Sequence, residues 1–245
     1  MQQLTETVET KGKKIGLQMN VKKCKTLVSD SWEDSREIRI GSTEVENVED
    51  FCYLGSWLST NGNCDKDCQI RIGKASSVFG RLQHVWRNKQ ISLKVKVRLY
   101  ESLVMSAMLY SAELWPLTIP QKKKLDAAHH KFQRRLLGIT WKDKVRNEDI
   151  RNQMKLQRMD LIIKERRLRR LGHLLRMEDD RIPKQATRWQ MDSCTKRAER
   201  PRSNWIDTVT RDLKPVSMAR EDAEQGSTSS SRQRRLAQTC GPMCL

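Results

Sequence analysis

The sequence LYESLVMSAMLYSAELW, residues 99–115, decides the fold. Apolar side chains fall on almost every side of a helix with this sequence, and Pro116 follows it directly. A helix that is apolar all round has to be covered by other elements. We therefore expect one helix from Ser92 to Trp115 at the centre of a helical core, with Leu103 buried in it.

The segment around this helix carries all of the net charge. Residues 71–176 hold 26 Lys and Arg against 8 Asp and Glu, whereas the two flanks together hold 22 of each kind. Apolar residues recur there at helical spacing, so the charge lies on helices with buried faces. A solvated basic surface would explain a small excess, but +18 in one segment favours a polyanionic partner, above all nucleic acid.

Composition limits the other possibilities. The chain has 245 residues, 37% of them hydrophobic and 32% charged, enough for one large domain or two small ones. Its seven cysteines, an odd number without regular spacing, favour reduced thiols. No long apolar run and no signal-peptide core occur, so we expect a soluble intracellular protein of the nucleus or cytoplasm that does not bind membranes.

Helices are predicted on both sides of the central stretch. Asp67 can cap a helix over residues 67–87, and Thr118-x-x-Gln121 is a capping box for a helix that ends at Gly138. A last long helix starts near Ile150, with Met154, Leu161, Leu168 and Leu175 recurring every seven residues on its inner face. The basic residues on the outer faces of these helices are Arg71, Lys74, Arg81, Arg87, Lys131, Arg134, Arg135, Arg158, Lys164, Arg166, Arg167, Arg169 and Arg170.

The N-terminal part has a different pattern. Residues 4–15 predict a short helix with Leu4 and Val8 on its inner side. Residues 36–40 alternate in the manner of a half-buried strand, and residues 51–55 predict a hairpin. The fold class expected is mainly α with a small α+β N-terminal unit.

Several motifs, in this order, resemble the C-terminal part of reverse transcriptases from non-LTR (LINE-like) retrotransposons. The resemblance covers roughly residues 16–215 and implies the end of the palm, the primer grip, the thumb and the connection. The motifs are Gly16-Leu17-Gln-Met-Asn20, Lys25-Thr26, Phe51-x-Tyr53-Leu54-Gly55-Ser56, Ile70-Arg-Ile72-x-x-Ala75, Leu109-Tyr110-x-x-Glu113-x-Trp115, Arg134-Arg-Leu-Leu-Gly-Ile-Thr-Trp141, Arg146-Asn147, Gly172-His173-x-x-Arg176-Met177 and Arg200-Pro201-x-x-x-Trp205.

The resemblance implies that Tyr53, Leu54 and Gly55 form a primer-grip-like hairpin; the simpler interpretation is an ordinary edge hairpin. It also implies that the catalytic aspartates, which bind Mg²⁺ in such enzymes, would lie upstream of Met1. The chain is therefore expected to be inactive alone, with no cofactor unless it is joined to an intact catalytic palm. Asp179-Asp180 is interpreted as a turn at a helix end and not as a metal site.

Other candidate sites are weak. Cys64-x-x-x-Cys68 lacks a second pair of zinc ligands, so free thiols are expected. His129 and His130 project about 100° apart on a helix, one into the core and one to solvent. His173 has no neighbouring carboxylate or nucleophile in sequence, which favours a packing role.

Four segments are expected. They are a palm remnant (1–60), a basic helical thumb-like module (61–178), a C-terminal extension with one short helix (179–224) and a flexible tail (225–245).

The expected function is non-catalytic binding of RNA or DNA through phosphate contacts, without sequence specificity. Two alternatives stay open: the C-terminal part of a longer active RNA-directed DNA polymerase, and a helical scaffold for an acidic protein. The sequence leaves the oligomeric state open.

Overall fold

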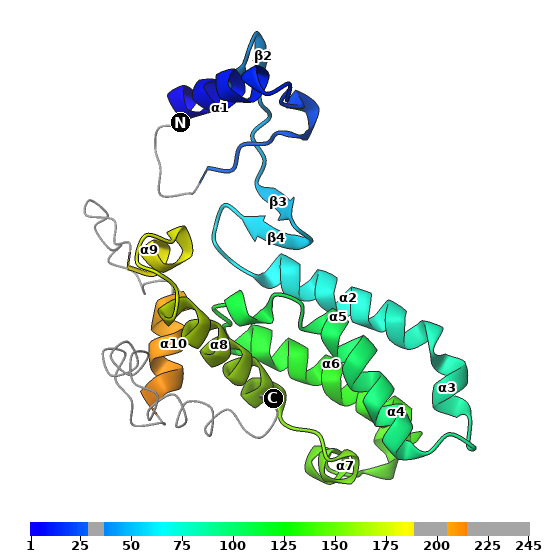
Figure 1. Cartoon of the computed structure of the whole chain (residues 1–245). Helices are drawn as coiled ribbons and strands as arrows, with labels where there is room; N and C mark the ends of the chain where they lie inside the picture. The colour runs from blue at the N-terminus through cyan, green and yellow to red at the C-terminus, as the bar shows by residue number, and fades with distance from the viewer. Residues whose placement is uncertain (29–36, 189–204, 215–245) are drawn as a thin grey trace. The chain divides into compact units, whose positions relative to one another are not determined.

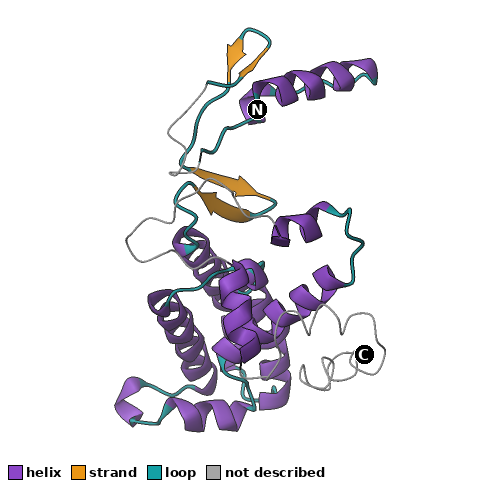
Figure 2. Ribbon diagram, turned by 90° about the vertical axis from the view of Figure 1, so that its left-hand side faces the viewer, coloured by secondary structure: helices purple, strands orange, loops and turns teal. Residues whose placement is uncertain are grey.

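The computed structural model describes residues 1–28, 37–188 and 205–214. The chain divides into two compact units, Met1–Ile70 and Arg71–Leu245. Helices make up 63% of the described residues, and the strands form two small hairpins, as Figure 2 shows. This confirms a mainly helical protein with a small α+β unit at the N-terminus. The expected tail, residues 225–245, lies outside the described residues.

The first unit contains little core. Its elements are α1 (Gln2–Lys14), η1 (Val21–Lys23), β1 (Arg39–Ile40), β2 (Thr43–Glu44), β3 (Asp50–Tyr53) and β4 (Ser56–Ser59). The strand pairs β1–β2 and β3–β4 are antiparallel, and Ile40 and Val45 are buried. The prediction that Leu4 and Val8 face inward is wrong, because these side chains are 60% and 51% exposed. Too little of the unit covers α1 to bury its apolar stripe.

The central stretch of the second unit is not one regular helix. It contains α4 (Leu93–Leu99), a π-helical turn η2 (Tyr100–Met105), α5 (Ser106–Met108) and the 3₁₀ turn η3 (Ala112–Leu114). The helix ends at Met108, and Ser111, with a left-handed φ of 60°, precedes the 3₁₀ turn η3. Tyr100, Val104, Met108 and Leu109 are buried, which confirms the stretch as core.

One side of this stretch faces solvent. Leu103 is 42% exposed, so the prediction that it is buried is wrong. It lies next to Ser102 and between Glu101 and Ser106, all exposed. These three polar residues show which side of the stretch faces solvent. A count of apolar residues alone does not reveal this side.

Two helices pack through aromatic side chains. α2 (Asp65–Arg81) is followed by a separate α3 (Gln83–Arg87), and the ring of Phe79 stacks on Trp86 and on Phe132 at centroid distances of 5.1 and 5.0 Å. Phe132 belongs to α6 (Ile119–Leu137), drawn in green in Figure 1. The capping box at Thr118 and the left-handed Gly138, φ 69°, confirm both predicted ends of α6.

The predicted long basic helix is two helices. α7 (Asn147–Met154) ends at Lys155, whose φ is 53°, and α8 (Met159–Leu175) begins four residues later. The buried residues of α8 are Met159, Ile163, Arg167, Leu171, Leu174 and Leu175. Leu161 is 49% exposed, so the predicted seven-residue stripe is wrong. Because the helix is broken after Met154, the position of Met154 does not determine which side of α8 is buried. The buried residues of α8 are spaced three or four positions apart, as on one face of a regular helix.

The C-terminal elements pack on α8. α9 (Ile182–Arg188) follows a turn that contains Asp179 and Asp180, as expected, and α10 (Trp205–Leu213) buries Val209 and Leu213. Leu171 and Leu175 of α8 form one apolar cluster with these two residues of α10. In the part of the chain that the structure describes, no helix has the length and apolarity required to cross a membrane.

Candidate nucleic-acid interface

Two of the predicted phosphate-binding residues are buried. Arg71 is 5% exposed, with its guanidinium 4.1 Å from the centre of the Tyr110 ring. Arg167 is 2% exposed and donates from Nε to Asp212 Oδ2 at 2.7 Å and from Nη1 to the Trp115 carbonyl at 2.8 Å. The prediction that these two face outward is wrong, because both stabilise contacts inside the helical unit.

Two other arginines are half-buried and hold loops in place. Arg134 donates from Nη2 to the Val145 carbonyl at 2.7 Å and to Asn147 Oδ1 at 2.9 Å. Arg166 donates to the Leu109 carbonyl at 2.9 Å, so the expectation that it projects into solvent is also wrong. Arg134 thus ties α6 to the segment before α7, and Arg166 ties α8 to the residue that follows α5.

The remaining cations of α8 are only partly available. Arg158, at its N-cap, binds Asp160 through two hydrogen bonds of 3.0 and 2.7 Å, and Arg169 binds Glu165 at 2.8 Å. Both arginines are exposed, whereas Lys164 and Arg170 are half-buried. A neighbouring carboxylate lowers the attraction of an arginine for phosphate, which weakens the case for α8 as the main binding surface.

Five of the predicted residues are exposed on α2, α3 and α6. We call Lys74, Arg81, Arg87, Lys131 and Arg135 the basic set. Lys74 and Arg81 are seven residues apart in α2, on one side of that helix, and Lys131 and Arg135 are four apart in α6. The Arg135 guanidinium lies 5.8 Å from the centre of the Phe79 ring, at the contact between α2 and α6.

A short loop after α6 presents a feature that sequence reasoning missed. Trp141 is 80% exposed at the start of the 3₁₀ turn η4 (Trp141–Asp143). Lys142, Lys144 and Arg146 follow it and are also exposed. The available signal was a tryptophan outside any apolar repeat, followed by three cations in five residues.

The primer-grip-like hairpin has a tight two-residue turn. Leu54 and Gly55 have φ values of 49° and 86° between β3 and β4. Positive φ at both positions is typical of a type I′ turn, but it is unfavourable for leucine. Tyr53 and Leu54 are 58% and 77% exposed. The predicted hairpin is confirmed, and its role as a primer grip stays a prediction.

Three of the four residues in the cysteine and histidine pairs are buried. Cys64 and Cys68 are buried free thiols, as predicted, and a hydrogen bond with Cys64 together with burial raises the pKa of the Cys68 thiol. His129 is buried and His130 half-buried, whereas His173 is exposed and does not pack as predicted. Among the described residues, no group of three or more His, Cys, Asp or Glu could hold a metal ion.

A polar cavity of about 210 Å³ lies between α6, α7 and α8. Its lining residues are Asp126, His129, His130, Glu148, Arg151, Arg158, Met159 and Asp160. Arg158 is already bound to Asp160, and Arg151 lies 3.8 Å from Glu148. Paired charges of both signs give this cavity no clear preference for an anion or a cation.

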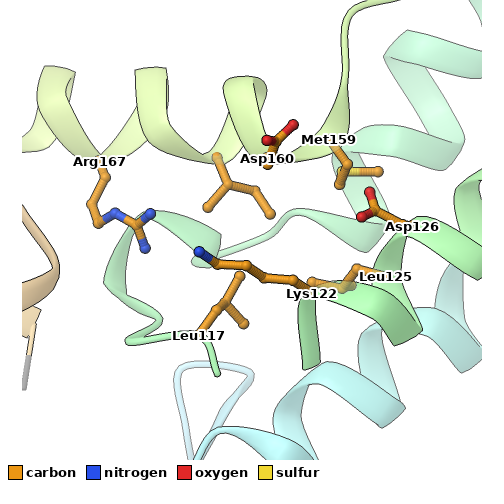
Figure 3. A pocket seen from close by; sticks show the side chains of 8 residues that line it. Leu117, Lys122, Leu125, Asp126, Met159, Asp160 and Arg167 are labelled. Atoms are coloured by element: carbon orange, nitrogen blue, oxygen red, sulfur yellow. The ribbon is translucent and has the colours of Figure 1, made fainter. Parts of the chain in front are cut away.

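A smaller space of about 10 Å³ lies beside this cavity, between α6 and α8 (Figure 3). Figure 3 shows Lys122 and Asp126 coming from α6, and Asp160 and Arg167 from α8. A volume of this size admits at most one water molecule. It is a packing defect beside the Arg167 contact and not a ligand site.

The chain is similar to an uncharacterized transposon-derived protein of Caenorhabditis elegans. The two are 25% identical over 218 residues, which cover 86% of this chain and 77% of the worm protein. This likeness is consistent with a transposon origin. No protein-family model matches the chain, and no solved structure matches it.

Proposed function

We propose that this chain is the non-catalytic C-terminal part of a non-LTR retrotransposon reverse transcriptase and binds nucleic acid through phosphate contacts. The observation that carries the proposal is the basic set, five cations exposed on helices whose opposite faces form the core. Lysine and arginine in such an arrangement neutralise phosphates and release counterions, whatever the base sequence. The order of the sequence motifs and the transposon-derived relative support the assignment to this class.

The proposal assigns no chemistry to this chain alone. Reverse transcription needs a set of carboxylates that holds two Mg²⁺ ions. Within the described residues no such set exists, and Lys184 forms an ion pair with Asp179 at 3.0 Å. The exposed hairpin at Tyr53 and Leu54 would act on a primer only beside a catalytic palm.

The test is binding of the purified chain to labelled duplexes of unrelated sequence at low salt. We expect similar affinities for all duplexes and no primer extension when Mg²⁺ and nucleotides are added. Tighter binding to polyglutamate than to any duplex would favour the acidic-protein scaffold instead. Reproducible primer extension by this chain alone would contradict the assignment as a non-catalytic part.

A further inference from the structure

We infer that Trp141 is a base-stacking platform and that the ligand it takes is single-stranded nucleic acid or the unpaired end of a duplex. This inference rests on the proposed function and names the substrate class. An indole that is 80% exposed removes a large apolar surface from water only when a partner covers it. A nucleobase presents a flat face of matching size, and stacking of bases on aromatic rings tolerates any base.

Hydrogen bonds on both sides of Trp141 fix the backbone of its loop. The backbone N–H and hydroxyl of Thr140 donate to Asp143 Oδ2 at 2.6 and 2.9 Å, closing a capping box around Trp141. The Thr140 backbone N–H keeps the pKa of the Asp143 carboxyl below its ordinary value. On the other side, Arg134 binds the Val145 carbonyl at 2.7 Å. A loop with a fixed backbone loses little conformational entropy when a base stacks on its side chain.

The charges beside the ring select the ligand. Lys142, Lys144 and Arg146 are exposed within five residues of Trp141 and can bind the phosphates on either side of a stacked base. In a duplex, neighbouring base pairs cover both faces of each base, so only a strand end or an unpaired base can reach the ring. The carboxylates of an acidic peptide could pair with the three cations, but they offer no flat face to stack on the indole. Nucleic acid offers both, so it is favoured over an acidic protein.

The experiment measures the affinity of the full chain for a labelled 20-nucleotide single strand and for the blunt duplex of the same sequence. Trp141→Ala should weaken single-strand binding about 5- to 150-fold. It should weaken binding of the duplex, in which only the two terminal base pairs expose a face, by much less. Trp141→Phe should keep most of the single-strand affinity. Ile119→Ala, which removes another exposed apolar side chain (69%), is the matched control and should change neither.

The outcomes separate the inference from the proposed function. Normal duplex binding with no effect of Trp141→Ala on the single strand overturns the inference alone. An equal loss for single strand and duplex also overturns it, because Trp141 would then support binding without stacking. Failure of the unmodified chain to bind either ligand overturns both. Both are also overturned if Trp141→Ala weakens binding to polyglutamate but does not weaken binding to nucleic acid.

Discussion

At the scale of single residues, the arginines of one basic segment do two different jobs. Arg167 is 2% exposed and bound to Asp212, whereas Arg169, two residues further on, has a side chain 53% exposed and bound to Glu165. Composition counts both as positive charge. Only the first is inside the fold, where the half-buried carboxylate of Asp212 would lose its partner if the arginine were removed.

Arg167→Ala should therefore destabilise the second unit by about 3–5 kcal/mol, the usual cost of removing one partner of a buried ion pair. Arg169→Ala, the matched control, removes an exposed pair in the same helix and should cost no more than about 1 kcal/mol. Urea unfolding followed by circular dichroism measures both. Equal midpoints for the two variants would show that Arg167 is not part of the core.

His129 is a second buried polar residue with a measurable effect. Its Nδ1 lies 2.7 Å from the Tyr100 hydroxyl and its Nε2 lies 2.7 Å from Nε2 of Gln133, so both ring nitrogens have partners. Burial, with the nearby His130, lowers the pKa of His129 from 6.5 to about 3. The folded protein therefore keeps this imidazole neutral under conditions in which the unfolded chain protonates it.

The unfolded state gains a proton at His129 as the pH falls below 6.5, so folding is progressively weakened between pH 6.5 and about 3. We expect a loss of about 1.4 kcal/mol between pH 7.5 and 5.5. His129→Gln should be less stable at pH 7.5 but lack this part of the pH dependence, while the exposed control His173→Gln should keep it. An unchanged pH slope in His129→Gln would contradict the assignment of a neutral buried histidine.

At the scale of elements, local signals predicted helix ends well and faces less well. Thr118, Gln121 and Gly138 define α6 by bonds within a few residues of each end, and the sequence contains all three. The inner face of α8 depends on where the helix starts, which the left-handed Lys155 changes. The sequence lacks a signal for this break, since lysine rarely adopts a left-handed conformation.

The burial of Arg71 and Arg167 could not be predicted from the sequence either, because their partners are far away along the chain. Arg167 meets Asp212 across 45 positions of sequence, and Arg71 meets Tyr110 across a distance that no helical repeat reveals. For the candidate site, periodicity placed the five residues of the basic set on exposed helix faces, as the structure does, and misplaced the arginines with distant partners. Trp141 was quoted only as the end of a motif and was not predicted to bind a ligand, because a turn after a helix carries no periodic pattern.

The two sides of the central stretch can be tested directly. Met108→Asp places a charge at a fully buried position, so it should cost several kcal/mol and unfold the second unit. Leu103→Asp, five residues earlier in the same stretch, places the charge on a side chain that is 42% exposed and should leave the protein folded. Circular dichroism at 25 °C measures both. The reverse result would mean that the π-helical turn η2 does not set the observed register.

At the scale of the whole molecule, the net charge of +18 is divided between stability and surface. Arg71, Arg134, Arg166 and Arg167 bond inside the helical unit, and the basic set projects from it. A chain that bound polyanions only through its overall charge would lose affinity equally when any lysine or arginine was removed. A chain with a defined duplex interface would lose its affinity for duplexes mainly when the basic set was changed.

The most direct test of this division is the salt dependence of duplex binding in two variants with the same net charge. The first replaces the basic set, Lys74, Arg81, Arg87, Lys131 and Arg135, with Gln; the second replaces Lys11, Lys13, Lys14, Lys22 and Lys23 of the first unit, which are also exposed. Each lost phosphate contact should lower the slope of log affinity against log salt by about 0.9. The account predicts a slope shallower by as much as about 4.5 in the first variant and a slope close to that of the unmodified chain in the second. Equal slopes in both variants, with both proteins folded, would contradict it.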